Sequence, residues 1–416
     1  MRINKLKSIL IISFIFMNSV AVMQSQNFMD ELQKKLSFQE FLNQVGKNNL
    51  GYLAEKYNVD IAEAEIIAQK VLPDPNLEFE AADETFTLGL AYNLELGNKR
   101  GARVRLAKSQ AELEKLALEY YYQGLRAEAA NLFLDAIQQR ELLNVKKSSY
   151  EYMLQLSQSD SIRFKLGEIT ETDARQSKLE AATLLNDVFE QEGIYKSALV
   201  VLNQFMGRTS DTLNIPQGKW EGLKRKYILP ELTSLGLTNR IDLFAAHKNT
   251  EVAANRHKLV KAERKMDIGL SVNYGRDWHG FLPPSRSYTA GISIPLKFSN
   301  FNKGAVKAAQ YGIEQTKLQK QNTELQVQSE ISQAFFHFEA AKKKVKQYQT
   351  GLLDESRKIL DGMVYKYKRG ETSIMEVLIA QRTYNDVQEQ YLETMKGYAS
   401  SLVDLQKTCG IWDIEF

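Results

Sequence analysis

Proline is absent from two long stretches of this chain of 416 residues. Its seven prolines stand at positions 73, 75, 216, 230, 283, 284 and 295. Residues 76–215 and 296–416 therefore lack the side chain that most effectively breaks a helix, so very long helices are possible there. The composition, with 44% hydrophobic and 25% charged residues, is that of a chain that folds and does not stay disordered.

Residues 1–26 are predicted to be a secretory signal peptide. The basic residues Arg2, Lys5 and Lys7 precede an apolar run from Ile9 to Met17, and small residues follow it. This run is short for a membrane-spanning helix, although an uncleaved anchor is the alternative. The remaining chain is almost neutral, so its charge gives no support for a nucleic-acid partner.

No pattern of residues indicates an enzyme or a cofactor site. The chain has one cysteine, Cys409, which excludes an internal disulfide and a cysteine-rich metal site. It has no glycine-rich phosphate loop and no Gly-x-Ser-x-Gly motif. The histidines lack partners at metal-ligand spacing; they are His247, His257, His279 and His337. We expect a protein without catalytic activity, cofactor or resident metal.

Three pairs of glycines share one offset of 203 positions, which indicates a tandem duplication. The pairs are Gly101 with Gly304, Gly167 with Gly370, and Gly207 with Gly410. The sequence thus predicts a signal peptide (1–26), a first structural repeat (27–207), a connecting segment (208–232), a second repeat (233–410) and a short tail (411–416).

Each repeat is predicted to contain a long helical hairpin. Residues 101–167 would extend about 100 Å as one helix, at about 1.5 Å per residue. In the second repeat a seven-residue spacing is typical of a coiled coil. The apolar residues at this spacing are Ile331, Phe338, Val345, Leu352 and Ile359. Three places after Ile331, Phe338 and Val345 stand Ala334, Ala341 and Tyr348. The lysines between them are expected on a solvated helix face.

Four segments alternate apolar and polar residues, as β-strands with two different faces do. The predicted strands are 76–82, 87–96, 267–275 and 288–298, joined within each repeat by loops 83–86 and 275–287. Pro295 fits poorly inside a strand. The polar face is expected to line an aqueous lumen; its residues are Glu78, Glu80, Asn93, Glu95, Asn273 and Lys297.

A half-buried soluble sheet and an outer-membrane barrel share this alternation. The signal peptide favours the barrel. Four strands cannot close one, since about eight is the practical minimum, so other copies of the chain must supply the rest. Two copies would give eight strands and three would give twelve.

The glycines at 167 and 370 are expected to end long helices at hairpin tips. Beyond them, Thr170-x-x-Asp173 and Ser373-x-x-Glu376 have the pattern of capping boxes that begin the next helix. Two roles are possible for Asp173 and Glu376, and both can hold at once. They can cap the helices, or oligomeric symmetry can turn each into a carboxylate ring that attracts cations and gates a helical tube.

With these repeats, strands and tips, the chain resembles the outer-membrane efflux proteins of the TolC type. The resemblance extends from Leu36-Ser37-Phe38-Gln39-Glu40 through Leu72-Pro73-Asp74-Pro75 to Leu405-x-x-x-x-Gly410, and it includes the paired strands and glycine tips. It implies a mainly α-helical homotrimer. Each protomer would give four strands to one twelve-stranded transmembrane β-barrel, continuous with a helical tube in the periplasm of a Gram-negative bacterium.

The resemblance also implies the function and the partners. It implies the exit duct of a tripartite efflux system, in outer-membrane lipid, that docks on a periplasmic adaptor and an inner-membrane pump of the resistance-nodulation-division type. The resemblance does not decide whether the exported cargo is metal cations, drugs or a peptide. The alternative from another class is a periplasmic coiled-coil adaptor or scaffold with a soluble sheet.

Individual residues carry over from the family motifs. Gly167, Glu168, Gly370 and Glu371 match the tips that meet the adaptor, while Tyr367, Glu376 and Asp173 match positions of the periplasmic gate. Two departures from the family motif leave undecided which bonds hold the gate closed. Thr372 stands where the family carries a gate arginine, and Ile379 stands where some members carry a second aspartate.

Overall fold

The computed structural model describes residues 35–209, 213–218, 220, 225–278, 283–296 and 300–414; the predicted signal peptide lies outside them. The chain forms two compact units, each drawn from both halves of the sequence. Unit 1 comprises Met1–Tyr52, Gln123–Thr233 and Ile331–Phe416, and unit 2 comprises Leu53–Tyr122 and Ser234–Glu330. The division into two sequence repeats therefore stays a prediction.

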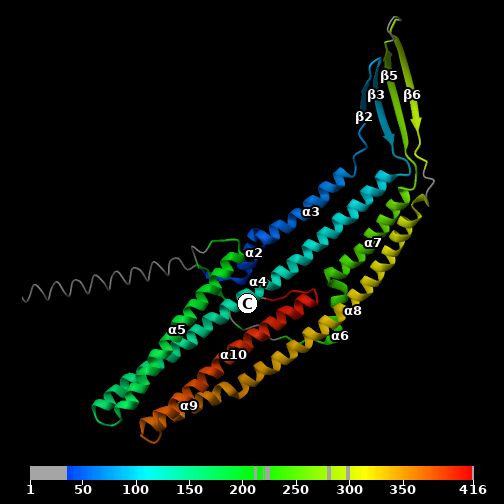
Figure 1. The fold of residues 1–416 in the computed structure, drawn as a ribbon. Coiled ribbons are helices and arrows are strands. Elements are labelled where there is room, and N and C mark those ends of the chain that lie inside the picture. Colours follow the sequence, from blue (N-terminus) through cyan, green and yellow to red (C-terminus); the bar gives the residue numbers. More distant parts are fainter. Residues whose placement is uncertain are drawn as a thin grey trace, which may run out of the picture. The chain divides into compact units, whose positions relative to one another are not determined.

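Unit 2 contains an antiparallel sheet (Figure 1). Its strands β2 (Asn76–Ala81), β3 (Thr85–Leu94), β5 (Ile268–Asp277) and β6 (Ser285–Ser293) lie in the order β2-β3-β5-β6. All four predicted strands are present. Pairing of β3 with β5 over ten residue pairs, from Thr85↔Asp277 to Leu94↔Ile268, joins the two hairpins into one sheet.

The strand ends correct several predictions. The second hairpin loop is shorter than 275–287, because β5 continues to Asp277 and β6 begins at Ser285. The predicted strand 288–298 ends at Ser293, two residues before Pro295, since proline cannot donate a ladder hydrogen bond. β3 ends at Leu94, so Glu95 lies beyond the strand. Lys297 lies outside the described residues.

The sheet has one apolar and one polar face, because directly paired residues of antiparallel strands point to the same side. One row across the sheet is Leu77, Leu90, Val272 and Ala290, and the next apolar row is Phe79, Leu88, Tyr274 and Tyr288. Much of this apolar face is exposed: Val272 is 63% and Tyr288 is 77% accessible to solvent. Within unit 2, no layer of the described chain covers it.

Helices complete unit 2. They are α3 (Leu50–Ala68), α6 (Leu229–Asn239), α7 (Ile241–Ala262), the 3₁₀ turn η1 (Asn300–Asn302) and the first parts of α4 (Lys99–Lys165) and α8 (Lys303–Gln347). Ion pairs link α4 to its neighbours: Lys115 lies 2.7 Å from Glu63 of α3, and Lys248 of α7 lies 2.6 Å from Glu112. None of the helices in the described ranges has both the length and the apolarity needed to cross a bilayer.

Unit 1 begins with β1 (Lys35–Ser37), which pairs in parallel with β4 (Ile215–Gln217), and the short helix α2 (Phe38–Asn48). Its main body consists of the second part of α4, α5 (Glu171–Phe205), the end of α8, α9 (Leu353–Lys368) and α10 (Ile374–Thr408). The predicted continuous helix over 101–167 is confirmed, because α4 runs for 67 residues without interruption.

A hydrophobic core joins the two helical hairpins of unit 1. Four helices contribute to it: Met153 and Leu156 come from α4, Ala181 and Leu184 from α5, Leu360 and Val364 from α9, and Ile374, Val377 and Leu378 from α10. The contact between the hairpins is therefore apolar along its centre. Charged pairs lie at its margins, such as Arg382 of α10 with Glu180 of α5 at 2.8 Å.

The predicted heptad in the second hairpin is correct only in its first part. Ile331, Phe338 and Val345 are buried, but Leu352 is 41% and Ile359 is 51% exposed. Between α8 and α9 the chain forms a π-helical turn, η2 (Tyr348–Leu352), in which Gly351 has non-helical angles of φ 177° and ψ −41°. A π-turn accommodates an extra residue, so the seven-residue spacing resumes one position later, at Leu353 and Leu360.

Candidate functional site

Both helical hairpins turn at their tips with the same backbone motif. Gly167 and Gly370 have φ values of 79° and 75°, in the left-handed region that glycine favours. After α4, the N–H of Glu168 donates to the carbonyl of Arg163 and the N–H of Gly167 to that of Phe164, both at 2.9 Å. After α9, Glu371 and Gly370 make the matching bonds to Lys366 and Tyr367 at 3.0 Å. These pairs form the Schellman motif that ends a helix.

The first tip has the capping box that its sequence predicted. Thr170 is the N-cap of α5, and its hydroxyl oxygen accepts from the N–H of Asp173 at 3.1 Å. The Asp173 carboxylate accepts from the hydroxyl of Thr170 at 2.7 Å and from its N–H at 3.4 Å. Asp173 thus fixes the start of α5.

The capping box predicted at the second tip is wrong. Ser373 is the N-cap of α10, but its side chain makes no capping hydrogen bond. The Glu376 carboxylate instead accepts a hydrogen bond from the hydroxyl of Thr372. This bond joins two side chains, so it fixes the Glu376 carboxylate without capping a backbone N–H of α10.

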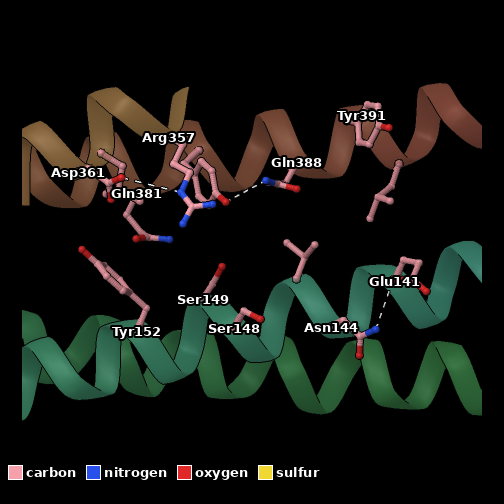
Figure 2. Close-up of a pocket in the computed structure, with 14 residues that line it drawn as sticks. Glu141, Asn144, Ser148, Ser149, Tyr152, Arg357, Asp361, Gln381, Gln388 and Tyr391 are labelled. Carbon is pink, nitrogen blue, oxygen red and sulfur yellow. Dashed lines mark hydrogen bonds and ion pairs between the residues drawn. The ribbon is translucent and has the colours of Figure 1, made fainter. Parts of the chain in front are cut away.

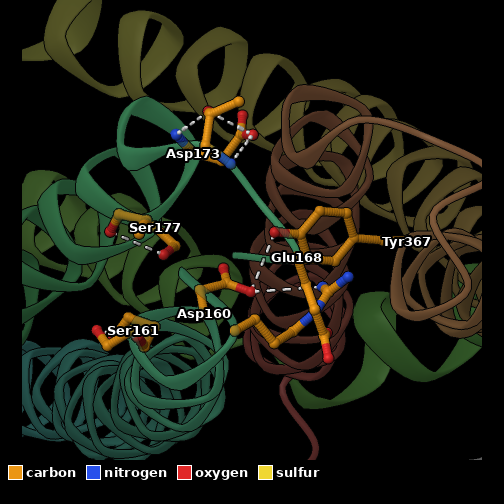
Figure 3. Close-up of polar contacts among 10 residues, drawn as sticks. Asp160, Ser161, Glu168, Asp173, Ser177 and Tyr367 are labelled. Carbon is orange, nitrogen blue, oxygen red and sulfur yellow. Dashed lines mark hydrogen bonds and ion pairs between the residues drawn. The ribbon is translucent and has the colours of Figure 1, made fainter. Parts of the chain in front are cut away.

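Tyr367 makes a buried polar contact between the two hairpins near their tips. Its ring is buried, with 4% exposed, and its hydroxyl donates to Oδ1 of Asp160 on α4 at 3.0 Å. Figure 3 shows the tyrosine reaching this aspartate from the other hairpin. Asp160 is fully buried, and the guanidinium of Arg163 lies 3.8 Å from the same oxygen and 5.1 Å from the centre of the tyrosine ring.

Burial governs the protonation of this pair. It raises the pKa of the Asp160 carboxyl, although hydrogen bonds from Ser177 and Tyr367 and the charge of Arg163 oppose the shift. Burial, followed by the charge of Asp160, raises the pKa of the Tyr367 hydroxyl well above its usual range. Tyr367 therefore keeps its proton at neutral pH and remains the donor.

Asp160 is a functional candidate that the sequence interpretation missed. It lies seven residues after Met153, which is also fully buried, so both occupy the same seam of α4. A carboxylate at a core position of a heptad was the available signal. Asp173, which the sequence pairs with Tyr367, lies near enough to raise the pKa of that tyrosine, but its carboxylate binds Thr170.

The acidic residues Glu168 and Glu371 pair with arginines of their own tips. Glu168 lies 3.2 Å from Arg163, and Glu371 lies 2.8 Å from Arg369. A Cβ atom added at Gly167 or Gly370 would meet no atom within 4 Å. The two turns therefore present open surface.

Four of the predicted lumen residues share the polar face of the sheet. Glu78 and Asn273 belong to one row, through Gly89, while Glu80 and Asn93 lie on other rows of that face. Glu95 departs from this set, since its carboxylate forms two hydrogen bonds with Arg103 at 2.6 and 2.8 Å. It joins the end of β3 to the start of α4.

Small residues dominate the polar face. A side chain added at any of four glycines would collide with a polar side chain of the next strand; the pairs are Gly89 with Asn273, Gly269 with Ser293, Gly275 with Ser287, and Gly291 with Ser271. These glycines make room for polar side chains that lie flat across the sheet. In the described ranges, no group of three or more histidine, cysteine or acidic side chains is placed to hold a metal ion.

Comparisons with known proteins agree with this architecture. Residues 232–410 match the family model described as outer membrane efflux protein. Over 374 residues the chain is 23% identical to the cobalt-zinc-cadmium resistance protein CzcC of Cupriavidus metallidurans, and the alignment covers 88% of each chain. The resemblance predicted from the sequence is confirmed.

Solved structures share the fold. The crystal structure of CusC superimposes with a TM-score of 0.75 at 14% identity, covering 91% of this chain and 93% of that one. The Campylobacter jejuni CmeC outer membrane channel gives a TM-score of 0.71 at 14% identity, covering 90% and 85%. The mainly helical fold with a small antiparallel sheet is therefore the fold of these channels.

Proposed function

Given the match to the outer membrane efflux proteins, we propose that this chain is the outer-membrane exit duct of a tripartite efflux system. It conducts substrates passively to the exterior of a Gram-negative cell and catalyses no reaction. The specificity for cargo then belongs to the pump and the adaptor that load it.

The exposed apolar face of the sheet is the observation that carries this proposal. Leu77, Phe79, Val272, Tyr288 and Ile292 are each more than 60% exposed on one face. An apolar patch of this kind on a soluble protein marks an interaction site or a liability for aggregation. In an outer-membrane barrel the same face contacts lipid, and the polar face opposite it lines water.

Closure of the barrel requires other copies of the chain. The strands at the edges of the sheet, β2 and β6, leave their outer backbone groups for pairing with a neighbour. Three protomers give the twelve-stranded barrel that the family resemblance implies. The long helices then form a tube on the periplasmic side.

The tips form the periplasmic gate and the adaptor-docking surface in this proposal. Tyr367, Asp173 and Glu376 are gate residues, and the contact of Tyr367 with Asp160 supports this role because it ties the two hairpins together within each protomer. Gly167, Glu168, Gly370 and Glu371 face the adaptor, which connects the duct to an inner-membrane pump of the resistance-nodulation-division type.

Heavy-metal cations are the proposed cargo. The relative that aligns over 88% of both chains is named for resistance to cobalt, zinc and cadmium. Glu78 and Glu80 on the polar face add negative charge that favours passage of cations. Loss of tolerance to these metals, with unchanged tolerance to organic drugs, is the expected phenotype of a deletion strain.

Two neighbouring residues on opposite faces of β5 provide the direct test. Val272→Arg places a charge on the lipid face and should cost about 2–4 kcal/mol near the middle of the bilayer. Asn273→Arg places the same charge in the lumen, so folding should be nearly unchanged and the cation preference of the pore should fall. Folding is measured by protease protection in lipid vesicles.

Equal folding of both variants would contradict the membrane placement of the sheet. Release of the wild-type protein from cell envelopes by salt without detergent would favour the other candidate, a periplasmic scaffold with a soluble sheet.

A further inference from the structure

The π-turn η2 determines which residue of α9 meets Asp160. Before the turn, the buried seam is Ile331, Phe338 and Val345, each seven residues after the last. After it, the buried residues Leu360 and Tyr367 are again seven apart, but one position later than the first series predicts. Had α8 continued into α9 as a regular α-helix, Ile359 and Lys366 would occupy those places.

The sequence of η2 and α9 supplies apolar residues for both registers at two of the three positions in the row that ends at Tyr367. Leu352 stands beside Leu353, and Ile359 stands beside Leu360. At the third position, nearest the tip, the choice is between Lys366, which is exposed, and Tyr367, which is buried. On the second buried row of α9, Met363 would replace Val364 and Glu355 would replace Ser356. The two registers therefore differ in polarity at two places, beside Ser356 and at Asp160.

The surroundings of η2 allow the helix to turn there. Gly351 leaves the helical region of φ and ψ, and no atom lies within 4 Å of the position a Cβ would take. Across to α10, the hydroxyl of Tyr348 donates a hydrogen bond to Gln390 at 3.1 Å, and its ring centre lies 6.0 Å from that of Tyr391. Beyond η2, a groove of about 460 Å³ separates α9 from α4, lined by Arg357, Asp361, Tyr152 and others (Figure 2).

We propose that η2 is the positioning element of the tip contact, and that Tyr367 and Lys366 are alternative partners of Asp160. In the π-turn state, Tyr367 binds Asp160 and the hairpins are joined. Absorbing η2 into a regular helix rotates α9 by about 100° and shifts it by about 1.5 Å, which is the step of one residue. Tyr367 then leaves the seam and the Lys366 ammonium takes its place at the carboxylate.

The two states have recognisable physical signatures. Rotation replaces a buried aromatic ring by a flexible, strongly hydrated cation, so the seam near the tip loosens. At the other two positions of the row that ends at Tyr367, leucine or isoleucine stays on the seam, so the apolar contact of that row is retained. π-turns within long helices are frequent at functional sites, where they re-aim side chains. The claim that this rotation opens a duct rests on the proposed function, whereas the register of α9 does not depend on it.

Paired substitutions test the register in the full chain purified in detergent. Leu360→Asn should speed hydrogen exchange of the α9 amides by at least about tenfold, since it places an amide in the core. Ile359→Asn should change exchange by less than about twofold, as exposed positions do. The reverse order, or equal effects, would overturn the register described here.

Single-residue deletions test the positioning role. Deletion of Gly351 removes the extra residue, so a regular helix should keep Leu360 and Tyr367 on the seam and retain the coupling between Tyr367→Phe and Asp160→Asn. Deletion of Gly362, beyond η2, should shift Tyr367 off the seam and abolish that coupling. Loss of coupling in both deletions, or in neither, would disprove the proposal.

A conduction measurement separates this inference from the proposed function. Removing Gly351 takes away the second register, and Lys366→Glu makes that register repel Asp160. Both should lower the frequency of opening in planar bilayers by about tenfold, a change of about 1.4 kcal/mol in the equilibrium between the two states. A wild-type chain that forms no pore would refute the duct and leave the register results standing. Normal opening in both variants would refute the switch alone.

Discussion

The two helical hairpins end in the same turn but reach it along different helices. α4 approaches its tip as one unbroken helix, whereas the second hairpin passes through the π-turn η2 before α9. The first tip then continues into a helix with a complete capping box, and the second into a helix whose N-cap side chain makes no capping hydrogen bond. In the proposed switch, the first hairpin is therefore the fixed support and the second hairpin carries the side of the contact that changes register.

The hydrogen bond between Tyr367 and Asp160 should show the strongest response. Tyr367→Phe removes a hydrogen bond to a buried carboxylate and should destabilise the tip by about 2 kcal/mol. Hydrogen exchange of the α9 amides measures this loss, and leak conductance should rise with it. Tyr365→Phe is the matched control, because that side chain is 60% exposed and accepts a bond from Arg369 at the surface. A similar loss in Tyr365→Phe would show that the contact of Tyr367 with Asp160 has no special role.

The turns themselves should respond equally at both tips. Gly167→Val and Gly370→Val each force a β-branched residue into the left-handed region, which costs about 1–2 kcal/mol or somewhat more. No neighbouring atom adds to that cost. Local exchange rates and adaptor binding report the result, and asparagine at the same positions should be milder. A much larger effect at one tip would reveal a contact that breaks the symmetry.

The buried carboxylate gives the contact a pH dependence. Because the folded-state pKa of Asp160 is raised, its favourable contribution is fully present below the ordinary aspartate pKa and is lost as pH rises through the folded value. The stability of the tip should thus increase on acidification, by at most about 1.4 kcal/mol per pH unit. Asp160→Asn should flatten that part of the profile of melting temperature against pH. An unchanged profile would show that another group titrates.

The smallest effect distinguishes the two caps. Thr170→Ala removes a complete capping box and should cost about 1 kcal/mol. Ser373→Ala removes a side chain without a capping bond and should change stability by less than about 0.5 kcal/mol. Exchange rates in the first turns of α5 and α10 measure both. Equal costs would mean that the two helix starts are alike in solution.

Local patterns predicted most of the architecture from the sequence. The scarcity of proline allowed the 67-residue helix, alternation predicted four strands, and the glycines predicted both tips. Each of these depends on interactions between residues close together in the chain, such as i to i−4 hydrogen bonds or steric limits on φ. The polar residues Glu78, Glu80, Asn93 and Asn273 could be assigned to one face for the same reason.

Contacts between distant segments could not be predicted from the sequence and are seen in the folded chain. The pairing of β3 with β5 depends on register across 170 residues or more, which no local pattern encodes. The heptad predicted after Val345 is wrong because two neighbouring residues satisfy the apolar pattern equally well at each step. These are Leu352 and Leu353, and then Ile359 and Leu360. Packing against α4 and α10 selects between them, and in doing so brings Tyr367 to Asp160.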